Sequence, residues 1–412
     1  MPAGKKDRIP GREAAVKGIR ILSTGTLFSS IMELGYPFFI LMAFRQIYLL
    51  FFSTFFELLP GSVSFIYRII KTLIKTQMSK LSTQHMGIQL KNPLILGASN
   101  MVTNIDKMKQ AEEAGIAAIV YRSLFEEQIQ LEDYEMGSQM EAYDERHAEM
   151  IDIFPEFEHG GPKEYLYNLK EVKNALSVPV IASLNAVYKE TWVEYAKQIE
   201  ETGVDGLELN FFAVPREFDR LGQDIVKEQI EVLKSVKSAV KFPVSVKLSS
   251  FYTNILKVVK EFDDAGADAF ILFNRLFEPD IDVESEKHIS PWNLSTPADH
   301  RLSIRYAGLL YDQIKANVAA NNGIYEGGDV VKMILAGATA VQCVSTFYHN
   351  GLKHIGTMLK EMESWMDKKG YDSIESFRGK LSKKATNDPF VYKRAQYIDL
   401  LLKSEELFKP KV

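Results

Sequence analysis

The chain has 412 residues, of which 46% are hydrophobic and 25% are charged, a composition that excludes collagen-like, disordered and disulfide-scaffold proteins. Cys343 is the single cysteine, so the chain has no internal disulfide and no cysteine-built zinc or iron–sulfur site, which fits a reducing compartment. The formal net charge of -5 does not favour binding to nucleic acid.

Charge divides the chain into two parts. Residues 1–77 hold ten Lys and Arg against four Asp and Glu, a net of +6, which leaves 39 basic and 50 acidic residues, a net of -11, for residues 78–412. The first part contains the apolar stretch GYPFFILMAFRQIYLLFFSTFF at 35–56, which is about long enough to cross a bilayer. Arg45 interrupts it, and an arginine near mid-span costs about 3 kcal/mol on the insertion scale.

Two interpretations of residues 1–77 stay open. The segment is either a membrane anchor or interfacial hairpin, or it is not part of the natural protein, because Met78 and Met86 both open a well-patterned soluble domain. The stretch is too long for a signal peptide, and no small-residue cleavage site follows it. We therefore predict a cytoplasmic protein, with attachment to the inner face of a membrane as the alternative.

From Lys91 onward, short apolar runs that are typical of buried parallel strands alternate with amphipathic helical stretches. Four helical stretches end in glycine just before the next run, in EEAGIAAIVY, EETGVDGLELN, DDAGADAFILFN and ILAGATAVQCV. Eight such units in about 270 residues predict an α/β fold, a (β/α)8 TIM barrel, with functional groups at the carboxyl ends of the strands. The expected strands are 93–98, 117–121, 179–184, 206–209, 243–248, 267–273, 317–320 and 340–344.

Polar residues follow nearly every expected strand, an arrangement suited to a large, planar, polar ligand. The last two strands are followed by NNGIYEGGDVVKMILAG and VSTFYHNG. Backbone amides at two adjacent helix starts, with Gly323, Gly327 and Gly328 allowing close approach, predict a phosphate site. The alternative is that these glycines only cap and turn.

Lys247 stands inside the apolar run PVSVKLS, where an ammonium group needs a partner. Because successive side chains of a strand point to opposite faces, Val246 and Leu248 are expected to point toward the helices and Lys247 into the barrel mouth. There Lys247 can stabilise the anionic reduced ring of a flavin, or form a Schiff base with a carbonyl substrate. A purely structural ion pair with Glu208 is the third interpretation.

From about Lys91 to Ser382 the sequence resembles the dihydroorotate dehydrogenase family of flavin mononucleotide (FMN) enzymes. It is also similar to the pyrimidine-binding barrel of dihydropyrimidine dehydrogenase. The pieces that carry the resemblance are NPLILGAS, IVYRSL, PVIASLNA, GLELN, FPVSVKLS, ILFNR, NNGIYEGGDVVKMILAGATAVQCVST and GYDSIESFRGKLS.

This resemblance implies FMN as cofactor, a dihydropyrimidine-like substrate and hydride transfer at flavin N5. It also suggests pairing as a homodimer. We expect no metal ion, because the acidic insert offers carboxylates with His147 or His159 as candidate ligands but no compact ligand spacing. The implied substrate contacts are Asn210, Asn274 and Arg122, and the implied catalytic residue is Lys247. The implied cofactor contacts are Ala98, Ser99, Arg122, Asn185, Asn210, Lys247, Asn322, Gly323, Val344 and Ser345.

The substrate side departs from the family pattern. Ala213 occupies the place of the cysteine or serine that removes a proton from substrate C5, and Arg122 replaces a lysine. The orotate-holding Met-Gly segment has no counterpart in the insert at about 124–165, which is acidic and shows no metal-ligand spacing. An acidic lid disfavours an anionic substrate, so we expect a neutral or cationic one.

Three hypotheses follow: a flavin-dependent oxidoreductase, a Schiff-base lyase or aldolase that uses Lys247, and a flavin-binding barrel without turnover. The electron acceptor is not identified by any glycine-rich dinucleotide motif. A quinone fits if residues 1–77 are native, and a soluble acceptor fits if translation starts at Met78.

Overall fold

The structure is a computed structural model. It describes residues 79–129, 162–211, 218–275, 278–291, 293–387, 389–393 and 396–403, all within the second of the chain's two units, Gln77–Val412. The extension at 1–77, Ala213 and most of the insert at 124–165 lie outside the described residues.

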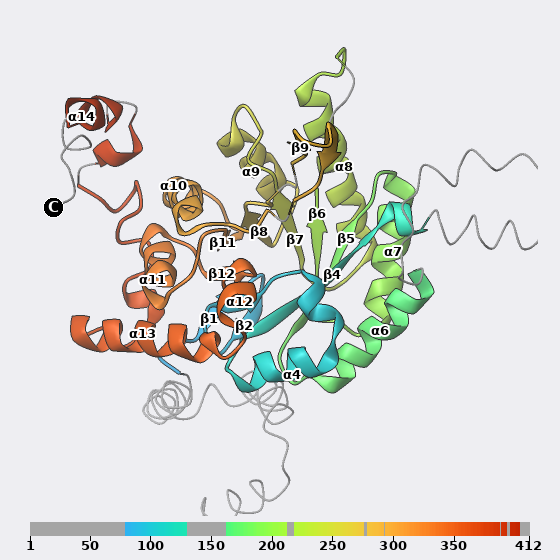
Figure 1. The fold of residues 1–412 in the computed structure, drawn as a ribbon, viewed down its shortest axis with the longest axis horizontal. Coiled ribbons are helices and arrows are strands. Elements are labelled where there is room, and N and C mark those ends of the chain that lie inside the picture. Colours follow the sequence, from blue (N-terminus) through green and yellow to red (C-terminus); the bar gives the residue numbers. More distant parts are fainter. Residues whose placement is uncertain are drawn as a thin grey trace, which may run out of the picture. The chain divides into compact units, whose positions relative to one another are not determined.

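Eight parallel strands close into a barrel, with strand order β11-β12-β3-β4-β5-β6-β7-β8, as Figure 1 shows. The strands are buried on both faces, which explains their nearly continuous apolar runs. The predicted (β/α)8 barrel is therefore confirmed, and each expected run contains or overlaps one strand. The barrel strands are β3 (Leu94–Leu96), β4 (Ala118–Phe125), β5 (Val180–Asn185), β6 (Gly206–Asn210), β7 (Val244–Leu248), β8 (Ala269–Leu272), β11 (Asn317–Asn321) and β12 (Ala340–Cys343).

Helices surround the barrel and cover its outer face (Figure 1). The four glycines predicted to end helices, Gly115, Gly203, Gly266 and Gly337, all have positive φ, the backbone region that glycine enters without a steric penalty. The α-helices are α4 (Ile105–Glu113), α6 (Pro162–Ala175), α7 (Lys189–Glu201), α8 (Gly222–Ala239), α9 (Ile255–Asp264), α10 (His300–Leu310), α11 (Gly327–Ala336), α12 (Ser345–Asn350), α13 (His354–Lys369) and α14 (Gln396–Leu402). Single 3₁₀ turns are η1 (Asn100–Thr103), η2 (Pro297–Asp299), η3 (Ile374–Ser376) and η4 (Pro389–Tyr392).

The interior of the barrel is apolar at its amino end. The antiparallel hairpin of β1 (Thr83–His85) and β2 (Ile88–Leu90) places Met86 and Leu90 in one cluster with small and branched strand residues such as Ala118 and Ile271. A Cβ on Gly206 would lie 2.8 Å from the Met86 side chain. The lack of a side chain at Gly206 therefore leaves room for Met86 of this hairpin.

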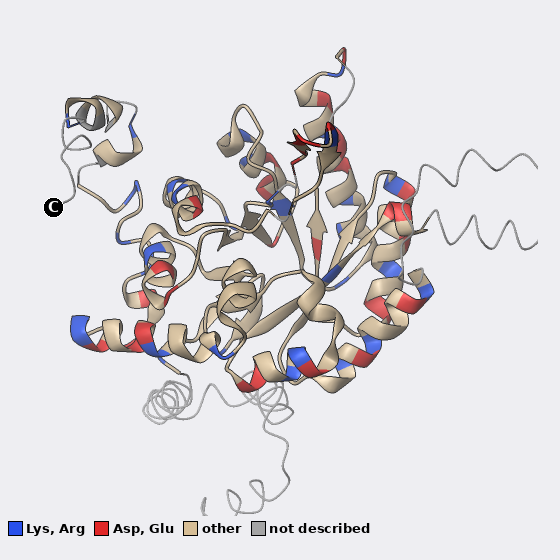
Figure 2. Cartoon of the chain, in the orientation of Figure 1, with Lys and Arg blue, Asp and Glu red and all other residues tan. Residues whose placement is uncertain are grey.

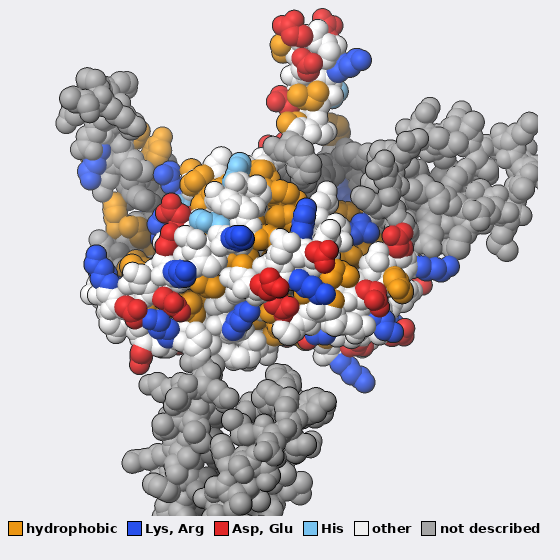
Figure 3. All heavy atoms as spheres, turned by 60° about the horizontal axis from the view of Figure 1, so that its bottom comes forward, with side chains coloured by type: hydrophobic (Ala, Val, Ile, Leu, Met, Phe, Trp, Pro, Cys, Tyr) orange, Lys and Arg blue, Asp and Glu red, His pale blue; other side chains and the backbone are white. Residues whose placement is uncertain are grey.

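One feature was not predicted from the sequence. A second antiparallel hairpin, β9 (Asp280–Asp282) with β10 (Lys287–Ile289), follows β8. Charged side chains mark the outer helices and the β9–β10 hairpin, while the barrel strands are almost free of them (Figure 2). On the face seen in Figure 3, both signs of charge are interspersed. No helix in the described part of the chain is long and apolar enough to span a bilayer.

Candidate active site

Three side chains from three strands meet inside the barrel near its carboxyl end. Lys247 Nζ on β7 lies 3.4 Å from Glu208 Oε1 on β6 and 3.5 Å from Gln342 Oε1 on β12. Gln342 Nε2 donates a 2.5 Å hydrogen bond to Glu208 Oε2. All three are buried, while Val246 and Leu248 pack in the core outside the barrel. The predicted inward direction of Lys247 and its ion pair with Glu208 are both present.

An asparagine network adjoins this trio. Asn185 at the end of β5 donates a 2.8 Å hydrogen bond to the backbone oxygen of Asn210, and Asn274 Nδ2 donates a 2.8 Å bond to Asn210 Oδ1. Asn210 pairs in register with Lys247 across β6 and β7. The structure thus brings together four of the predicted site residues. Asn185, Asn210 and Lys247 follow the inward alternation of their strands, whereas Asn274 lies just beyond the end of β8.

The two loops predicted to bind phosphate also meet, through a residue that the sequence analysis missed. Ser295 Oγ accepts a 3.0 Å hydrogen bond from the Gly323 amide and donates a 2.9 Å bond to Ser345 Oγ. Gly323 has φ of 65°, and a Cβ there would lie 2.5 Å from the His300 amide nitrogen. Neighbouring Asn322 has φ of 68° and donates a 2.9 Å bond to the Phe273 carbonyl oxygen.

The sequence analysis expected free backbone amides at the start of α11, but the Gly327 amide already has a partner. The Gly327 amide donates a 2.7 Å hydrogen bond to Glu361 on α13, and a Cβ on Gly327 would lie 2.4 Å from the Met358 oxygen. Asp329 accepts bonds from the amides of Tyr325 and Glu326. Gly327 is therefore a packing and capping glycine, the alternative that the sequence left open.

A polar side chain without a hydrogen-bond partner lies just after β3, the first barrel strand in sequence order. Ser99 Oγ is buried and has no hydrogen-bond partner among the described residues, although a buried hydroxyl normally has one. Ala98 beside it packs on the interior apolar cluster. Val344 lies close by, since a Cβ on Gly97 would be 2.9 Å from a Val344 methyl carbon. An unpaired buried hydroxyl at a strand exit is compatible with a bound polar ligand.

Arg122 lies apart from these groups. Its guanidinium carbon is 5.6 Å from the ring centroid of Tyr165 on α6, and the Tyr165 hydroxyl donates a 3.0 Å hydrogen bond to the Arg122 carbonyl oxygen. A register shift in β4 between Val120 and Ser123 interrupts the strand alternation at this point. Burial raises the pKa of Tyr165, so its phenol stays neutral beside the arginine.

Sequence reasoning also missed the hydroxyl pair of Ser123 and Ser183, whose Oγ atoms are 2.7 Å apart. Ser183 has the same strand phase as Asn185 on β5, but the register shift in β4 hides its partner from a reading of the sequence. Gln342 was hidden within an apolar run, and Ser295 lies in a long connection far from any strand exit. Only the Ser-Thr-Pro sequence before α10 signalled a local role, as a helix start.

The residues fit a bound flavin mononucleotide in three respects. The Ser295–Gly323–Ser345 group offers small residues for a phosphate, the asparagines offer amides, and Lys247 offers a buried cation. In the described ranges, no three His, Cys, Asp or Glu side chains are grouped in a way that would hold a metal ion.

Comparisons with known proteins point to one family. The family model for dihydroorotate dehydrogenase matches residues 80–366. A curated relative from Thermoplasma volcanium, "Dihydroorotate dehydrogenase B (NAD(+)), catalytic subunit", is 30% identical over 73% of this chain and 98% of its own length. A protein of the same name from Methanocaldococcus jannaschii is 27% identical over 69% of this chain and 93% of its own. "Dihydroorotate dehydrogenase A (fumarate)" from Lactobacillus helveticus is 28% identical over 50% of this chain and 68% of its own.

Proposed function

Because the chain belongs to the dihydroorotate dehydrogenase family, we propose that it is an FMN-dependent oxidoreductase acting on the CH–CH bond of a dihydropyrimidine-like substrate. The observation that carries the proposal is the buried Lys247 among polar groups at the carboxyl end of the barrel. An ammonium held there counterbalances negative charge on a reduced flavin ring.

Each group of residues has a place in this function. FMN, when bound, supplies a ring that accepts a hydride from substrate carbon. Lys247 stabilises the resulting charge, and Ser295, Gly323 and Ser345 hold the phosphate. Asn185 and Ser99 bond the flavin edge. Asn210 and Asn274, already joined by a hydrogen bond, orient the substrate.

The Schiff-base alternative is less well supported. A lysine attacks a carbonyl only as the neutral amine, whereas Lys247 Nζ is engaged in an ion pair with the Glu208 carboxylate 3.4 Å away. Trapping of a carbonyl substrate on Lys247 with borohydride would restore this alternative.

Ala213 favours a second candidate, a flavin-binding barrel without turnover. Alanine cannot accept a proton, and proton transfer by a positioned base contributes about 10² to 10⁴-fold to a rate. Reduction of the bound flavin by a reduced pyrimidine separates an enzyme from a binding module, because the module retains the flavin but leaves it oxidised.

The electron acceptor is proposed from the relatives. The names of two of them specify NAD+ and a catalytic subunit, and another specifies fumarate. We infer a cytoplasmic catalytic subunit whose NAD+ site lies on another chain. If residues 1–77 are native and bind a membrane, a quinone replaces NAD+ as the acceptor.

The test uses the purified full chain under anaerobic conditions. We expect a yellow protein whose oxidised-flavin absorbance bleaches when uncharged dihydrouracil is added, and bleaches more slowly with anionic dihydroorotate because of the acidic insert. NAD+, fumarate and a soluble quinone are then compared as reoxidants. A colourless protein that does not take up added FMN excludes the proposal, and equal rates with both pyrimidines exclude the charge argument.

A further inference from the structure

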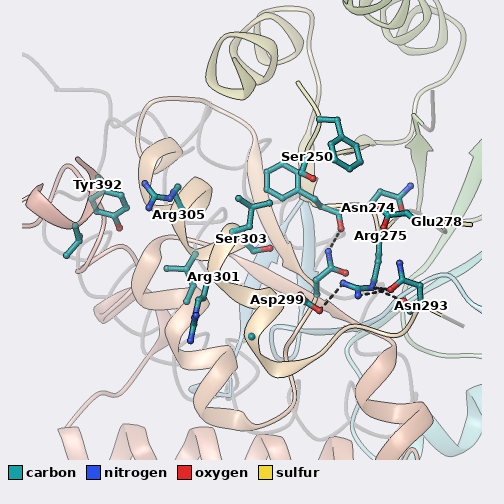
Figure 4. A pocket seen from close by; sticks show the side chains of 17 residues that line it. Ser250, Asn274, Arg275, Glu278, Asn293, Asp299, Arg301, Ser303, Arg305 and Tyr392 are labelled. Atoms are coloured by element: carbon teal, nitrogen blue, oxygen red, sulfur yellow. Dashed lines mark hydrogen bonds and ion pairs between the residues drawn. The ribbon is translucent and has the colours of Figure 1, made fainter. Parts of the chain in front are cut away.

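A cavity of about 760 Å³ lies beside the barrel mouth, and its volume is in the range of small-molecule sites. Figure 4 shows it between the exit of β8 and the helix α10, with Tyr392 of η4 at one end. Its lining includes Ser250, Phe273, Asn274, Asn293, Leu302 and Asn322. The cavity is therefore built from strand-exit loops together with the exposed face of one helix.

Three arginines line this cavity, and one of them is fully engaged. Arg275 donates 2.7 and 2.8 Å hydrogen bonds to the backbone and side-chain oxygens of Asn293 and a 2.9 Å bond to Asp299 Oδ2. Asp299 Oδ2 also accepts from the amide and hydroxyl of Thr296 in the cap before α10. Arg275 and Asp299 thus neutralise each other and form one wall.

The other two arginines, Arg301 and Arg305, lie one turn apart on α10 and are exposed. Within the described part of the chain, neither side chain forms an ion pair or hydrogen bond. Figure 4 shows both apart from the dashed Arg275 network, with Tyr392 beyond Arg305. Glu278 also lines the cavity, but it forms no ion pair with either arginine among the described residues.

These arginines belong to a part of the chain, residues 78–412, that carries a net charge of -11. Like charges one turn apart on a helix repel weakly, so an anion bound to either guanidinium group relieves the repulsion and gains a charge-assisted contact. The planar guanidinium group matches carboxylate and phosphate oxygens in a bidentate manner. The cavity is thus electrostatically prepared for an anion.

The walls suit the rest of a small organic molecule. Phe273 is buried behind the cavity, while Phe251 is exposed at its edge. Tyr392 is fixed, because its hydroxyl donates a 2.6 Å hydrogen bond to the Leu381 oxygen and its ring presses on Gly308, where a Cβ would meet the ring. Burial raises the pKa of Tyr392, so this wall remains uncharged.

We propose that this cavity binds a small organic anion bearing a phosphate or carboxylate group, with that group held by the guanidinium group of Arg301 or Arg305 and its body against Phe273 and Tyr392. The cavity shares Asn274 and Asn322 with the proposed substrate and cofactor contacts, but Ser295, Gly323 and Ser345 do not line it, and anion binding by Arg301 and Arg305 does not require turnover.

The experiment measures anion binding to the full-length protein by calorimetry and by the shift in Tm. Inorganic phosphate and succinate are titrated separately, with sodium chloride at matched ionic strength, and FMN is added in excess to occupy its own phosphate site. We expect saturable binding of at least one anion. A response to phosphate alone assigns a phosphorylated ligand, and a response to succinate alone assigns a carboxylate.

The variants decide the location. The double variant R301Q/R305Q should weaken the anion response at least tenfold, and R301Q alone should weaken it partly. The matched control, K360Q/K368Q, removes the same charge from exposed positions of α13 and should leave binding unchanged. No saturable binding, or an equal loss in the two double variants, overturns the proposal.

Discussion

Lys247 and Glu208 face each other inside the barrel, with Nζ and Oε1 3.4 Å apart and both side chains almost wholly buried. They extend from neighbouring strands, β7 and β6, and Gln342 reaches both of them from β12. This buried pair therefore has two separable consequences, one for the stability of the barrel and one for the charge that a bound ligand experiences.

The first prediction concerns stability. Lys247→Met leaves a buried carboxylate without its cation, so the free energy of unfolding should fall by about 3 to 5 kcal/mol. Glu208→Gln should also destabilise, whereas the double variant should cost less than the sum of the two. Urea denaturation of all four proteins measures the coupling, and strictly additive losses would show that the pair is not an interacting unit.

The second prediction concerns the flavin, and it rests on the proposed function. Glu208→Gln removes a negative charge beside Lys247, so the reduction potential of bound FMN should rise, while Lys247→Gln should lower it. The potential is measured by dye-coupled titration. Glu190→Gln, an exposed change of the same charge on α7, is the control. Shifts of the same sign in the two interior variants contradict the assigned role.

The third prediction tests the phosphate loops. Gly323→Ala places a Cβ 2.5 Å from a backbone nitrogen at φ of 65°, so the loop must move and FMN affinity should fall at least tenfold. Gly203→Ala is the matched control, because Gly203 has φ of 82° with no atom near its Cβ position. Fluorescence titration of FMN into the flavin-free proteins compares them. Equal affinities would place the phosphate elsewhere.

Much of this arrangement followed from the sequence, because strand alternation and glycine-ended helices are local properties. They predicted the eight strands, the inward Lys247 and the exits that carry Asn185, Asn210 and Asn274. Ser295 could not be predicted in the same way, because its contacts with Gly323 and Ser345 span 28 and 50 residues of sequence. Arg122 was expected among the cofactor and substrate contacts, but its side chain lies over the ring of Tyr165. The register of β4 shifts beside Arg122, and no residue pattern reveals such a shift.

The fourth prediction concerns the missing base. Ala213→Cys should raise the rate of dihydroorotate oxidation, by up to the 10² to 10⁴-fold that general bases contribute, if position 213 corresponds to the base of the family. Stopped-flow measurement of flavin bleaching gives the rate of the reductive half-reaction. Ala213→Val, which adds bulk without a titratable group, should not raise it. An unchanged rate in Ala213→Cys would mean that the proton leaves by another group.

The fifth prediction concerns acid stability and His85. Its Nδ1 lies 2.9 Å from Thr339 Oγ1, and the Thr339 hydroxyl donates to the Val318 carbonyl oxygen, so His85 is the donor and its neutral ring is satisfied. Burial lowers the pKa of His85 from 6.5 to about 4. The unfolded chain therefore binds a proton at a higher pH than the folded chain does.

The sign follows from that difference. The free energy of unfolding is unaffected by protonation of His85 above pH 6.5. As the pH falls from 6.5 toward 4, protonation of His85 in the unfolded chain lowers this free energy by about 1.4 kcal/mol per pH unit and by roughly 3 kcal/mol in all. Denaturant midpoints between pH 7 and 4 should fall less steeply in His85→Gln than in the unchanged protein. His349→Gln replaces an exposed histidine and should retain the full slope. Parallel profiles for the unchanged protein and His85→Gln would assign the acid sensitivity to other groups.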